Sequence, residues 1–458
     1  MEFQKIKLHR SEKNRAAVTQ ITLDDDYNVP DYRQDIVKVI KERGELRFDE
    51  VKAMEGAAWI KGSLVFKVLY RSDKQEGKIS CLRGEIPFQE RLNMDGLSEY
   101  DAVHATGDME DLTIGVINSR KLNVRAVIVL TASSEKEVDE ELTCELSDGS
   151  SYEQNIVEKE ALKLLVVRRD ICRQKSEAVL PSSKPNIREI LWQSMQLRNV
   201  ESRLVEGNIR LSGEILVSIL YNDEEEGEHL SWYETTVPLD AQAECGVMED
   251  DCIWQVQMVP LTMELEVKPD YDGEERILVM ELALDTHIRI WKEEKIRLLT
   301  DLYSLQKEVK PVFRECPLER LLVKNAAKCR MTEQMELKED KEKVLQICSC
   351  EGKVLLERQE IKTDGVLAEG TVEVNILYIT PDDHMPVGAV QEIYPFSQLV
   401  EIPEMSAQAK VELDASLEQL SAVMLDQEHV EIRAAVRLDL IAFVQEVIQN
   451  IEEATESE

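Results

Sequence analysis

The stretch LSGEILVSILY, residues 211–221, decides the fold because the chain contains it three times. Nearly the same pattern recurs as KGSLVFKVLY at 61–70 and as AEGTVEVNILY at 368–378. In each copy apolar side chains alternate with a more polar set, and a period of two is typical of a strand with one face in a core. The sequence therefore predicts the same half-buried β-strand in three places.

The residues around this strand keep a constant spacing. Each copy has a glycine, then a tyrosine eight residues later, then a proline seventeen residues after the tyrosine. These residues are Gly62, Gly213 and Gly370, then Tyr70, Tyr221 and Tyr378, then Pro87, Pro238 and Pro395. Pro30 and Pro181 each stand 32 residues before the glycine of their copy. The units repeat every 151 to 157 residues, which indicates a tandem array of whole domains rather than a short-period solenoid.

Each repeated residue type has an expected structural role. The glycines permit a bulge or a close backbone approach at the start of the strand. The tyrosines end the buried face, where each ring is expected to pack and each hydroxyl to form a hydrogen bond at the rim. Ligand stacking is the alternative role for these rings. The prolines suit an edge strand or a bend, because they offer no N–H to a ladder.

Several other segments show the same alternation, and turn-rich clusters separate them. RILVMELAL at 276–284 and HVEIRAAVRL at 429–438 are examples, and this spacing is typical of a sandwich or barrel. In DIVKVI at 35–40 the apolar residues recur at helical spacing, so we expect a short helix that Asp35, or Asn186 in the next copy, would cap. The predicted fold is mainly β, with three tandem antiparallel sandwich-like or barrel-like units, each with one or two short helices.

The composition between the repeats predicts the domain boundaries. We expect units at 1–135, 156–306 and 326–450. An acidic linker would occupy 136–155, and a second linker, partly helical, would occupy 307–325. Residues 451–458 are expected to form a flexible acidic tail.

The charge of the chain limits its partners. The 458 residues carry a net charge of −36, whereas nucleic acid binding needs a basic surface and anionic membranes attract one. The N-terminus lacks the apolar segment of a signal peptide, and no apolar run approaches the 18 residues that span a bilayer. The nine cysteines are an odd number, which favours reduced thiols in a cytoplasm. A protein partner is therefore expected.

A search for chemistry finds few candidates. The sequence has no phosphate-cradling glycine loop, no nucleophile elbow and no HExxH, and its six histidines are far apart. Cys348 and Cys350 are the only close thiol pair, and alternation would place both on one strand face as small core residues. We predict no catalytic residue, no metal site and no cofactor. Asn118, Arg120 and Lys121 form either a solvated hairpin turn or a basic recognition spot on an acidic surface.

These motifs, taken in order, resemble a known domain. The first unit has VPDYRQDI at 29–36, a strand ending in VLY at 68–70, EIPF at 85–88 and INSRKLNVRAVI at 117–128. The second unit has LPSSKPNI at 180–187, LYNDEE at 220–225 and LLTDLYSL at 298–305. This combination resembles the SPOCS domain of the SipL family of spore coat morphogenetic proteins of anaerobic spore-forming bacteria. The resemblance covers almost the whole chain and is strongest in the first unit and weakest in the third.

The resemblance implies a non-enzymatic role. SipL-like proteins act in the mother-cell cytoplasm, gather at the forespore surface and bind the coat-basement ATPase while the coat encases the spore. Members of that family end in a LysM domain that makes this contact, and no segment of this sequence resembles LysM. The implied partner is therefore the ATPase or another coat morphogenetic protein. The alternative function is a β-domain module that binds a polysaccharide or a small molecule.

Overall fold

The structure is a computed structural model that describes residues 1–457, except for 73–76, 148–151, 225–228, 247–248, 250, 339–341, 404 and 407, and except for the side chains of 12–15 and 457. The described residues form eighteen strands. These are β1 (Phe3–Asn28), β2 (Lys38–Met54), β3 (Ala57–Arg71), β4 (Ile79–Asn93), β5 (Val103–Asn118), β6 (Lys121–Leu146), β7 (Glu153–Val179), β8 (Ile187–Val205), β9 (Asn208–Asp223), β10 (Leu230–Glu244), β11 (Ile253–Pro269), β12 (Glu275–Tyr303), β13 (Glu308–Glu336), β14 (Gln346–Ile361), β15 (Gly365–Ile379), β16 (Val387–Glu401), β17 (Lys410–Met424) and β18 (His429–Ser457).

The strands pair into six antiparallel sheets of three strands, and one arrangement occurs three times. In the first unit, β1 to β6, the sheets have the orders β2-β3-β4 and β1-β6-β5. The second unit, β7 to β12, has β8-β9-β10 and β7-β12-β11, and the third, β13 to β18, has β14-β15-β16 and β13-β18-β17. Each sheet has two open edges, so no sheet in the described part of the chain closes into a barrel.

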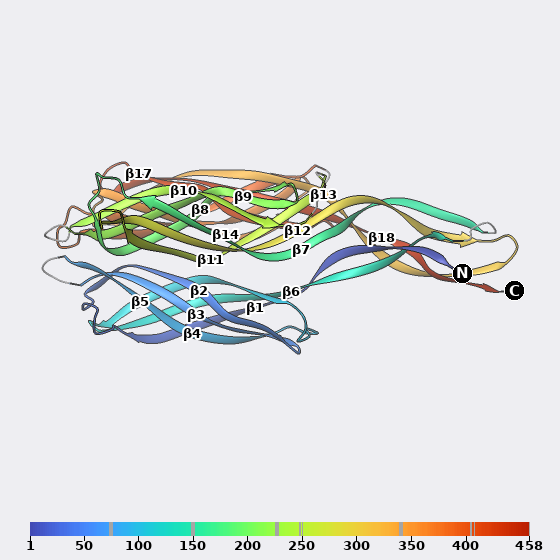
Figure 1. Ribbon diagram of the computed structural model, residues 1–458, viewed down its shortest axis with the longest axis horizontal. Helices are drawn as coiled ribbons and strands as arrows, with labels where there is room; N and C mark the ends of the chain where they lie inside the picture. The colour runs from blue at the N-terminus through green and yellow to red at the C-terminus, as the bar shows by residue number, and fades with distance from the viewer. Residues whose placement is uncertain are drawn as a thin grey trace.

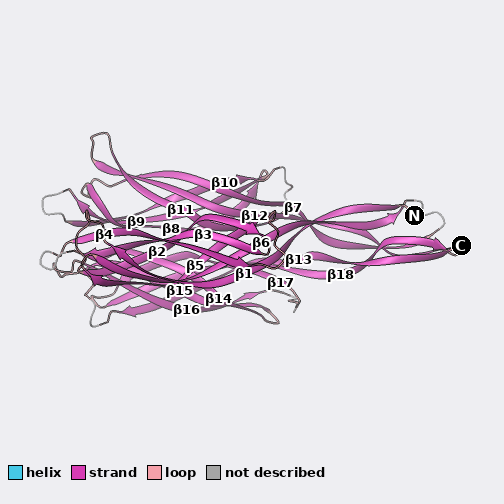
Figure 2. Cartoon of the chain, turned by 90° about the horizontal axis from the view of Figure 1, so that it is seen from below, coloured by secondary structure: helices cyan, strands magenta, loops and turns pink. Residues whose placement is uncertain are grey.

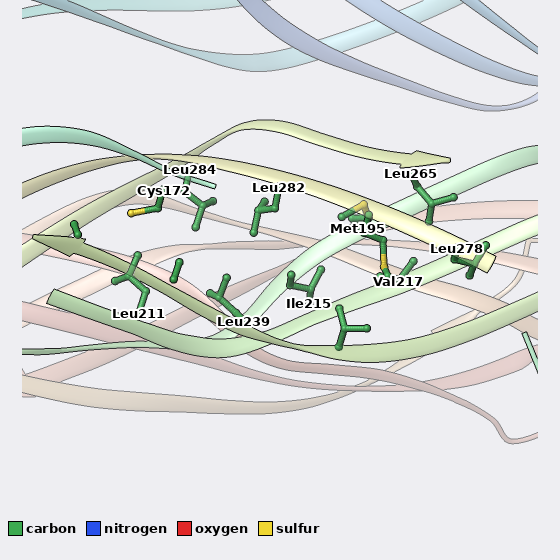
Figure 3. Packing of buried hydrophobic residues seen from close by; sticks show 14 of the residues in the cluster. Cys172, Met195, Leu211, Ile215, Val217, Leu239, Leu265, Leu278, Leu282 and Leu284 are labelled. Atoms are coloured by element: carbon green, nitrogen blue, oxygen red, sulfur yellow. The ribbon is translucent and has the colours of Figure 1, made fainter. Parts of the chain in front are cut away.

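Each unit has its own apolar core between its two sheets. The repeated strand is the middle strand of one sheet, as β3, β9 and β15. In the second unit Ile215 and Val217 on β9 face Leu282 and Leu284 on β12 (Figure 3). Equivalent clusters fill the first and third units. The alternation that predicted the strand is therefore the alternation that builds the core.

The predicted short helices are wrong. The described residues contain no helix, and consequently none that could cross a membrane (Figure 2). At 35–40 the chain turns and enters β2, where Ile36 N–H donates to Ser119 O at 2.9 Å. A β-bulge at Ile40 then shifts the register between Val39 and Lys41. The bulge explains why apolar residues occur at 36, 39 and 40 without a helix. Val39 packs in the core of the unit, whereas the bulged Ile40 faces the opposite side of the sheet.

The same bulge explains a second correction. In the third unit the register shifts between Ile347 and Ser349, so Cys348 is the bulged residue. Cys348 and Cys350 therefore do not share a face: Cys350 lies in the unit core and Cys348 on the outer side of the sheet. Burial raises the pKa of both thiols to about 12.

The segments predicted as linkers lie largely in strands. The described part of 136–155 forms the end of β6 and the start of β7, and 308–325 lies in β13. The tail predicted to be flexible is 451–458; residues 451–457 end β18, Ile451 is buried, and residue 458 lies outside the described residues. The first and last strands of each unit are 26 to 29 residues long, compared with 15 to 19 for the others.

The extra length of these six strands forms a stem. Beyond the sandwiches the pairs β1–β6, β7–β12 and β13–β18 continue together, with both chain termini at the far end (Figure 1). All three ribbons contribute buried apolar residues, including Leu142, Leu298 and Leu318. Each ribbon buries one face against the other two, so its strands can be acidic on the other face.

Candidate functional site

The repeated tyrosines occupy equivalent positions in all three units. Tyr70, Tyr221 and Tyr378 are fully buried. Their hydroxyls donate to the backbone carbonyls of Gln34 at 3.1 Å, Pro185 at 3.1 Å and Glu342 at 3.0 Å, respectively. Burial raises the pKa of all three hydroxyls, to about 12 for Tyr221 and Tyr378. Each tyrosine ties the end of the middle strand to the chain entering the same sheet.

Each repeated glycine lies opposite the residue that follows the repeated proline on the neighbouring strand. Gly62 pairs with Phe88, and Gly370 pairs with Phe396. A Cβ at Gly62 would lie 2.9 Å from the Phe88 ring, and one at Gly370 would lie 2.8 Å from the Phe396 ring, so both positions require a close approach. Gly213 pairs with Leu239 in the second unit. Pro87, Pro238 and Pro395 lie on β4, β10 and β16, which are edge strands, as expected for a residue without an N–H.

The Arg120 side chain links the turn before β6 to the turn before β2 in the first unit, and is called the arginine fastener below. Its guanidinium donates to Arg33 O at 2.7 Å, Pro30 O at 2.8 Å and Val29 O at 3.2 Å, and it contacts Asp35 Oδ1 at 3.2 Å. Asn118 Oδ1 accepts the Arg120 N–H at 2.9 Å. Pro30 thus lies in a turn that Arg120 fixes.

Lys121 pairs with Asp26 at 2.7 Å, so the three predicted interaction residues all have partners within the first unit. Their recognition role remains a prediction.

The second unit contains the same fastener, which the sequence motif did not reveal. Arg276 donates to Pro181 O at 2.6 Å, Lys184 O at 3.0 Å and Asn186 Oδ1 at 2.5 Å. Arg276 was missed because the turn before it is longer in the second unit, which displaces the following strand in the alignment of the repeats.

The third unit reverses the charges at this position. Glu428 takes the place of Arg120, since Leu337 N–H donates to Glu428 O as Val29 N–H donates to Arg120 O. Lys343 takes the place of Asp35 and lies 3.1 Å from Glu428. The ion pair therefore survives with its sign inverted, which hides it from any search for a shared residue type.

The three units meet at a shared apolar core. Equivalent residues from the outer faces of β3, β9 and β15 pack together there: Leu69, Leu220 and Leu377. The bulged residues of β2, β8 and β14 join them: Ile40, Leu191 and Cys348. The bulge thus has a packing role, because it turns one extra apolar side chain toward the other units.

A buried charge cluster lies beside this shared core. Glu351 Oε1 accepts from Trp192 Nε1 at 3.1 Å and lies 3.3 Å from Lys41 Nζ, and its other oxygen lies 3.3 Å from Arg43. Burial alone would raise the pKa of Glu351, but Lys41 and Arg43 outweigh it and lower the pKa. All three units contribute to this cluster, so it fixes how they are arranged.

A cavity of about 740 Å³ lies between the three units. The first unit contributes His104, the second Arg169, Asp285 and Trp254, and the third Arg437, among other lining residues. Opposite charges pair at its wall: Asp285 lies 3.4 Å from Arg169 and 3.7 Å from His104. Burial and the nearby Arg169 lower the pKa of His104.

Comparison with protein families identifies two segments of the chain. The family described as SipL, SPOCS domain, matches residues 35–117 and 343–425. These segments lie in the first and third units, and each runs from the turn before the second strand to the end of the fifth. No curated protein and no solved structure matches the chain. The two matches begin and end 308 residues apart, which is also the spacing of Tyr70 and Tyr378. The chain therefore contains SPOCS domains of the SipL type in its first and third units.

Proposed function

We propose that this protein is a non-enzymatic structural adaptor of bacterial sporulation, which binds partner proteins during coat assembly at the forespore surface. The observation that carries the proposal is the pair of SPOCS matches in the first and third units. The partner would be the coat-basement ATPase or another coat morphogenetic protein, in the mother-cell cytoplasm.

We further infer that the middle unit is a third SPOCS domain. It has the same order of strands, the same buried tyrosine and the same arginine fastener as the first unit. The three domains would then span β1 to β6, β7 to β12 and β13 to β18, and would act as one body rather than as separate binding modules.

The decisive experiment is to image a fluorescent fusion through sporulation, with and without the coat-basement ATPase. A ring around the forespore that disperses without the ATPase is expected. A ring that persists would support another coat protein as the partner. Diffuse signal in both strains, or expression only in vegetative cells, would reject the coat role.

The cavity between the units supports the alternative, a module that binds a small molecule or a saccharide. Its volume lies in the range of ligand pockets, and its wall combines Trp254 with charged side chains. A screen of saccharides and small metabolites by thermal shift tests this candidate. A ligand whose stabilising effect is lost in Trp254→Ala would favour it over the adaptor.

A further inference from the structure

Apolar side chains are exposed in or directly before the turn between the last two strands of every unit. In the first unit these are Val116 and Ile117, in the second Tyr271, and in the third Met424 and Leu425. Ile117 and Leu425 are about half exposed, at 51% and 52%, and Tyr271 is fully exposed. Such side chains gain nothing from exposure in the isolated protein. This turn presents at least one of them in all three units.

The three turns lie at one end of the molecule, called the loop end here. The strands β6, β12 and β18 begin at these turns and finish together in the stem, so their starting points lie at the opposite end (Figure 1). Contacts between units hold this end together. Arg33 pairs with Glu189 at 3.1 Å, and Lys38 pairs with Glu342 at 3.2 Å. The exposed apolar residues of the three turns, called the tips below, therefore belong to units that are packed together.

The same local hydrogen bond orders the turn beside the exposed apolar side chains of each unit. A side-chain oxygen accepts the N–H two residues later in every unit: from Asn118 to Arg120 at 2.9 Å, from Asp270 to Asp272 at 2.9 Å and from Asp426 to Glu428 at 2.8 Å. Asp270 also accepts the Glu274 N–H at 3.0 Å. Presenting an apolar side chain on a fixed turn lowers the entropy that a complex must spend on ordering it.

The charges around the tips restrict the occupant. The turn of the second unit carries Asp270, Asp272 and Glu274, and that of the third carries Asp426 and Glu428. The turn of the first unit carries Arg120 and Lys121 instead, which pair with Asp35 and Asp26. An anionic membrane would be repelled by these carboxylates, whereas a protein with lysines and arginines around an apolar pocket would be attracted. Tyrosine is enriched among the residues that dominate binding at protein interfaces, and the rim of such interfaces is polar.

We propose that the loop end is a docking surface for a second protein, which offers apolar pockets to Ile117, Tyr271 and Leu425 and basic side chains around the pockets for Tyr271 and Leu425. This inference rests on the proposed adaptor function and narrows it to one surface. The stem and the shared core then serve to hold the three tips in register.

Photo-crosslinking in sporulating cells tests the surface directly. The photoreactive residue p-benzoylphenylalanine replaces Tyr271 in one strain and Leu425 in another. In a third strain it replaces Tyr100, which is 89% exposed on the turn between β4 and β5, away from the loop end. We expect one shared protein adduct from positions 271 and 425, and no such adduct from position 100. The same adduct from all three positions, or from position 100 alone, overturns the proposal.

The adduct partner is then purified and its binding to the full chain is measured. The triple variant Ile117→Ser, Tyr271→Ser and Leu425→Ser should weaken binding at least about tenfold, while Tyr100→Ser leaves it unchanged. Added salt should weaken binding to the wild type. Unchanged affinity in the triple variant rejects the surface.

Three outcomes separate this inference from the proposed function. Flotation with phosphatidylglycerol vesicles that is lost in the triple variant would make the loop end a membrane contact and reject a protein partner. An adduct with a protein that is not part of the coat keeps the docking surface but rejects the coat role. A coat partner that binds the triple variant normally keeps the coat role but rejects the docking surface.

Discussion

The buried tyrosine hydroxyl is the smallest feature that all three units share. An unpaired hydroxyl at this depth would cost about 1–3 kcal/mol, so each tyrosine needs an acceptor. Each finds one in the carbonyl 36 residues earlier in the chain. The fixed distance between the two residues in the sequence is therefore a physical constraint on the unit.

Removing one of these hydroxyls should lower stability without disturbing the fold. We expect Tyr221→Phe to reduce the free energy of unfolding by about 1 kcal/mol, because the ring stays in place while the Pro185 carbonyl loses its donor. Urea denaturation followed by circular dichroism measures the change. The matched control is Tyr271→Phe, at an exposed tyrosine in the same unit. An equal loss in both variants would contradict the role of the hydrogen bond.

The arginine fasteners should contribute more than their exposure suggests. Arg276→Met removes the donor from three backbone carbonyls and one side-chain oxygen, so we expect a loss of about 2 kcal/mol. Lys121→Met, which removes a single exposed ion pair, should cost less than about 1 kcal/mol. Thermal unfolding of both variants compares them. Equal melting temperatures for the two would show that the fastener is an ordinary surface contact.

Sequence spacing predicted some of these residues and not others, for a physical reason. Three positions could be predicted because each requires one residue type. Gly62 allows a close approach of the Phe88 ring, Tyr221 places a hydroxyl at the edge of the core, and Pro395 lies on an edge strand. The fastener requires only complementary charge, so Arg120 became Glu428 in the third unit. Arg276 kept its type but followed a longer turn. An interaction that different residue types can form leaves no shared motif in the sequences of the repeats.

At the scale of strands, the bulges and the stem were the features that alternation could not predict. A bulge inserts one residue, so apolar positions at 36, 39 and 40 mimic a helical period. The stem strands were predicted to be linkers because only one face of each two-stranded ribbon is buried, which limits the number of apolar residues in their sequences. The other face carries the carboxylates that suggested disorder. Both errors arise because the burying partners belong to distant parts of the chain.

A buried asparagine holds the three ribbons of the stem in register. Asn450 is 2% exposed. Its Oδ1 accepts the Thr143 N–H at 2.8 Å, and its Nδ2 donates to Thr143 O at 2.8 Å and to Leu299 O at 3.0 Å. One side chain therefore connects all three units. A buried polar residue of this kind specifies register in other assemblies of parallel elements.

Replacing this asparagine should loosen the stem. We expect Asn450→Leu to cost about 2 kcal/mol or more, because a buried N–H and two carbonyls of other ribbons lose their partner. Amide hydrogen exchange should increase in β6, β12 and β18 near the substitution, while the sandwich cores stay protected. Gln449→Leu, on the same strand, is the control. Unchanged exchange in the stem would show that apolar packing alone sets the register.

At the scale of the whole molecule, acid should weaken the contact between the first and second units. Burial alone would raise the pKa of Glu135, but hydrogen bonds from His287 and Ser11 outweigh it and lower the pKa to about 2. The His287 Nε2 atom lies 2.8 Å from the carboxylate. Because the folded pKa lies below the unfolded value of about 4.5, the stabilisation is present above pH 4.5 and is lost as the pH falls toward 2.

A glutamine at this position removes the titration. Glu135→Gln should lower stability at neutral pH by up to about 3 kcal/mol, and the gap from the wild type should close as the pH approaches 2. The midpoints of urea unfolding, measured for the wild type and Glu135→Gln between neutral pH and pH 2, test whether the difference in stability shrinks as the pH falls. Glu137→Gln, at an exposed site on the same strand, should show no such convergence. A constant gap at every pH would mean that Glu135 acts through packing.

The three units should also remain together when the chain between them is cut. A protease site placed at 304–307, the turn between β12 and β13, lets the second and third units be separated covalently while the described contacts remain. The β13–β18 ribbon stays packed in the stem, and Glu351 stays bonded to Trp192 and close to Lys41. We expect both fragments to elute together in size-exclusion chromatography, and the Asn450→Leu background to promote their separation.

This outcome distinguishes two kinds of adaptor. Units joined only by linkers would dissociate after cutting and would gain affinity through effective concentration. Units that stay together instead present a single surface with fixed tips, so the spacing of the three tips becomes part of what a partner recognises. Separate elution of the two fragments at micromolar concentration would contradict the single body and restore the model of independent domains.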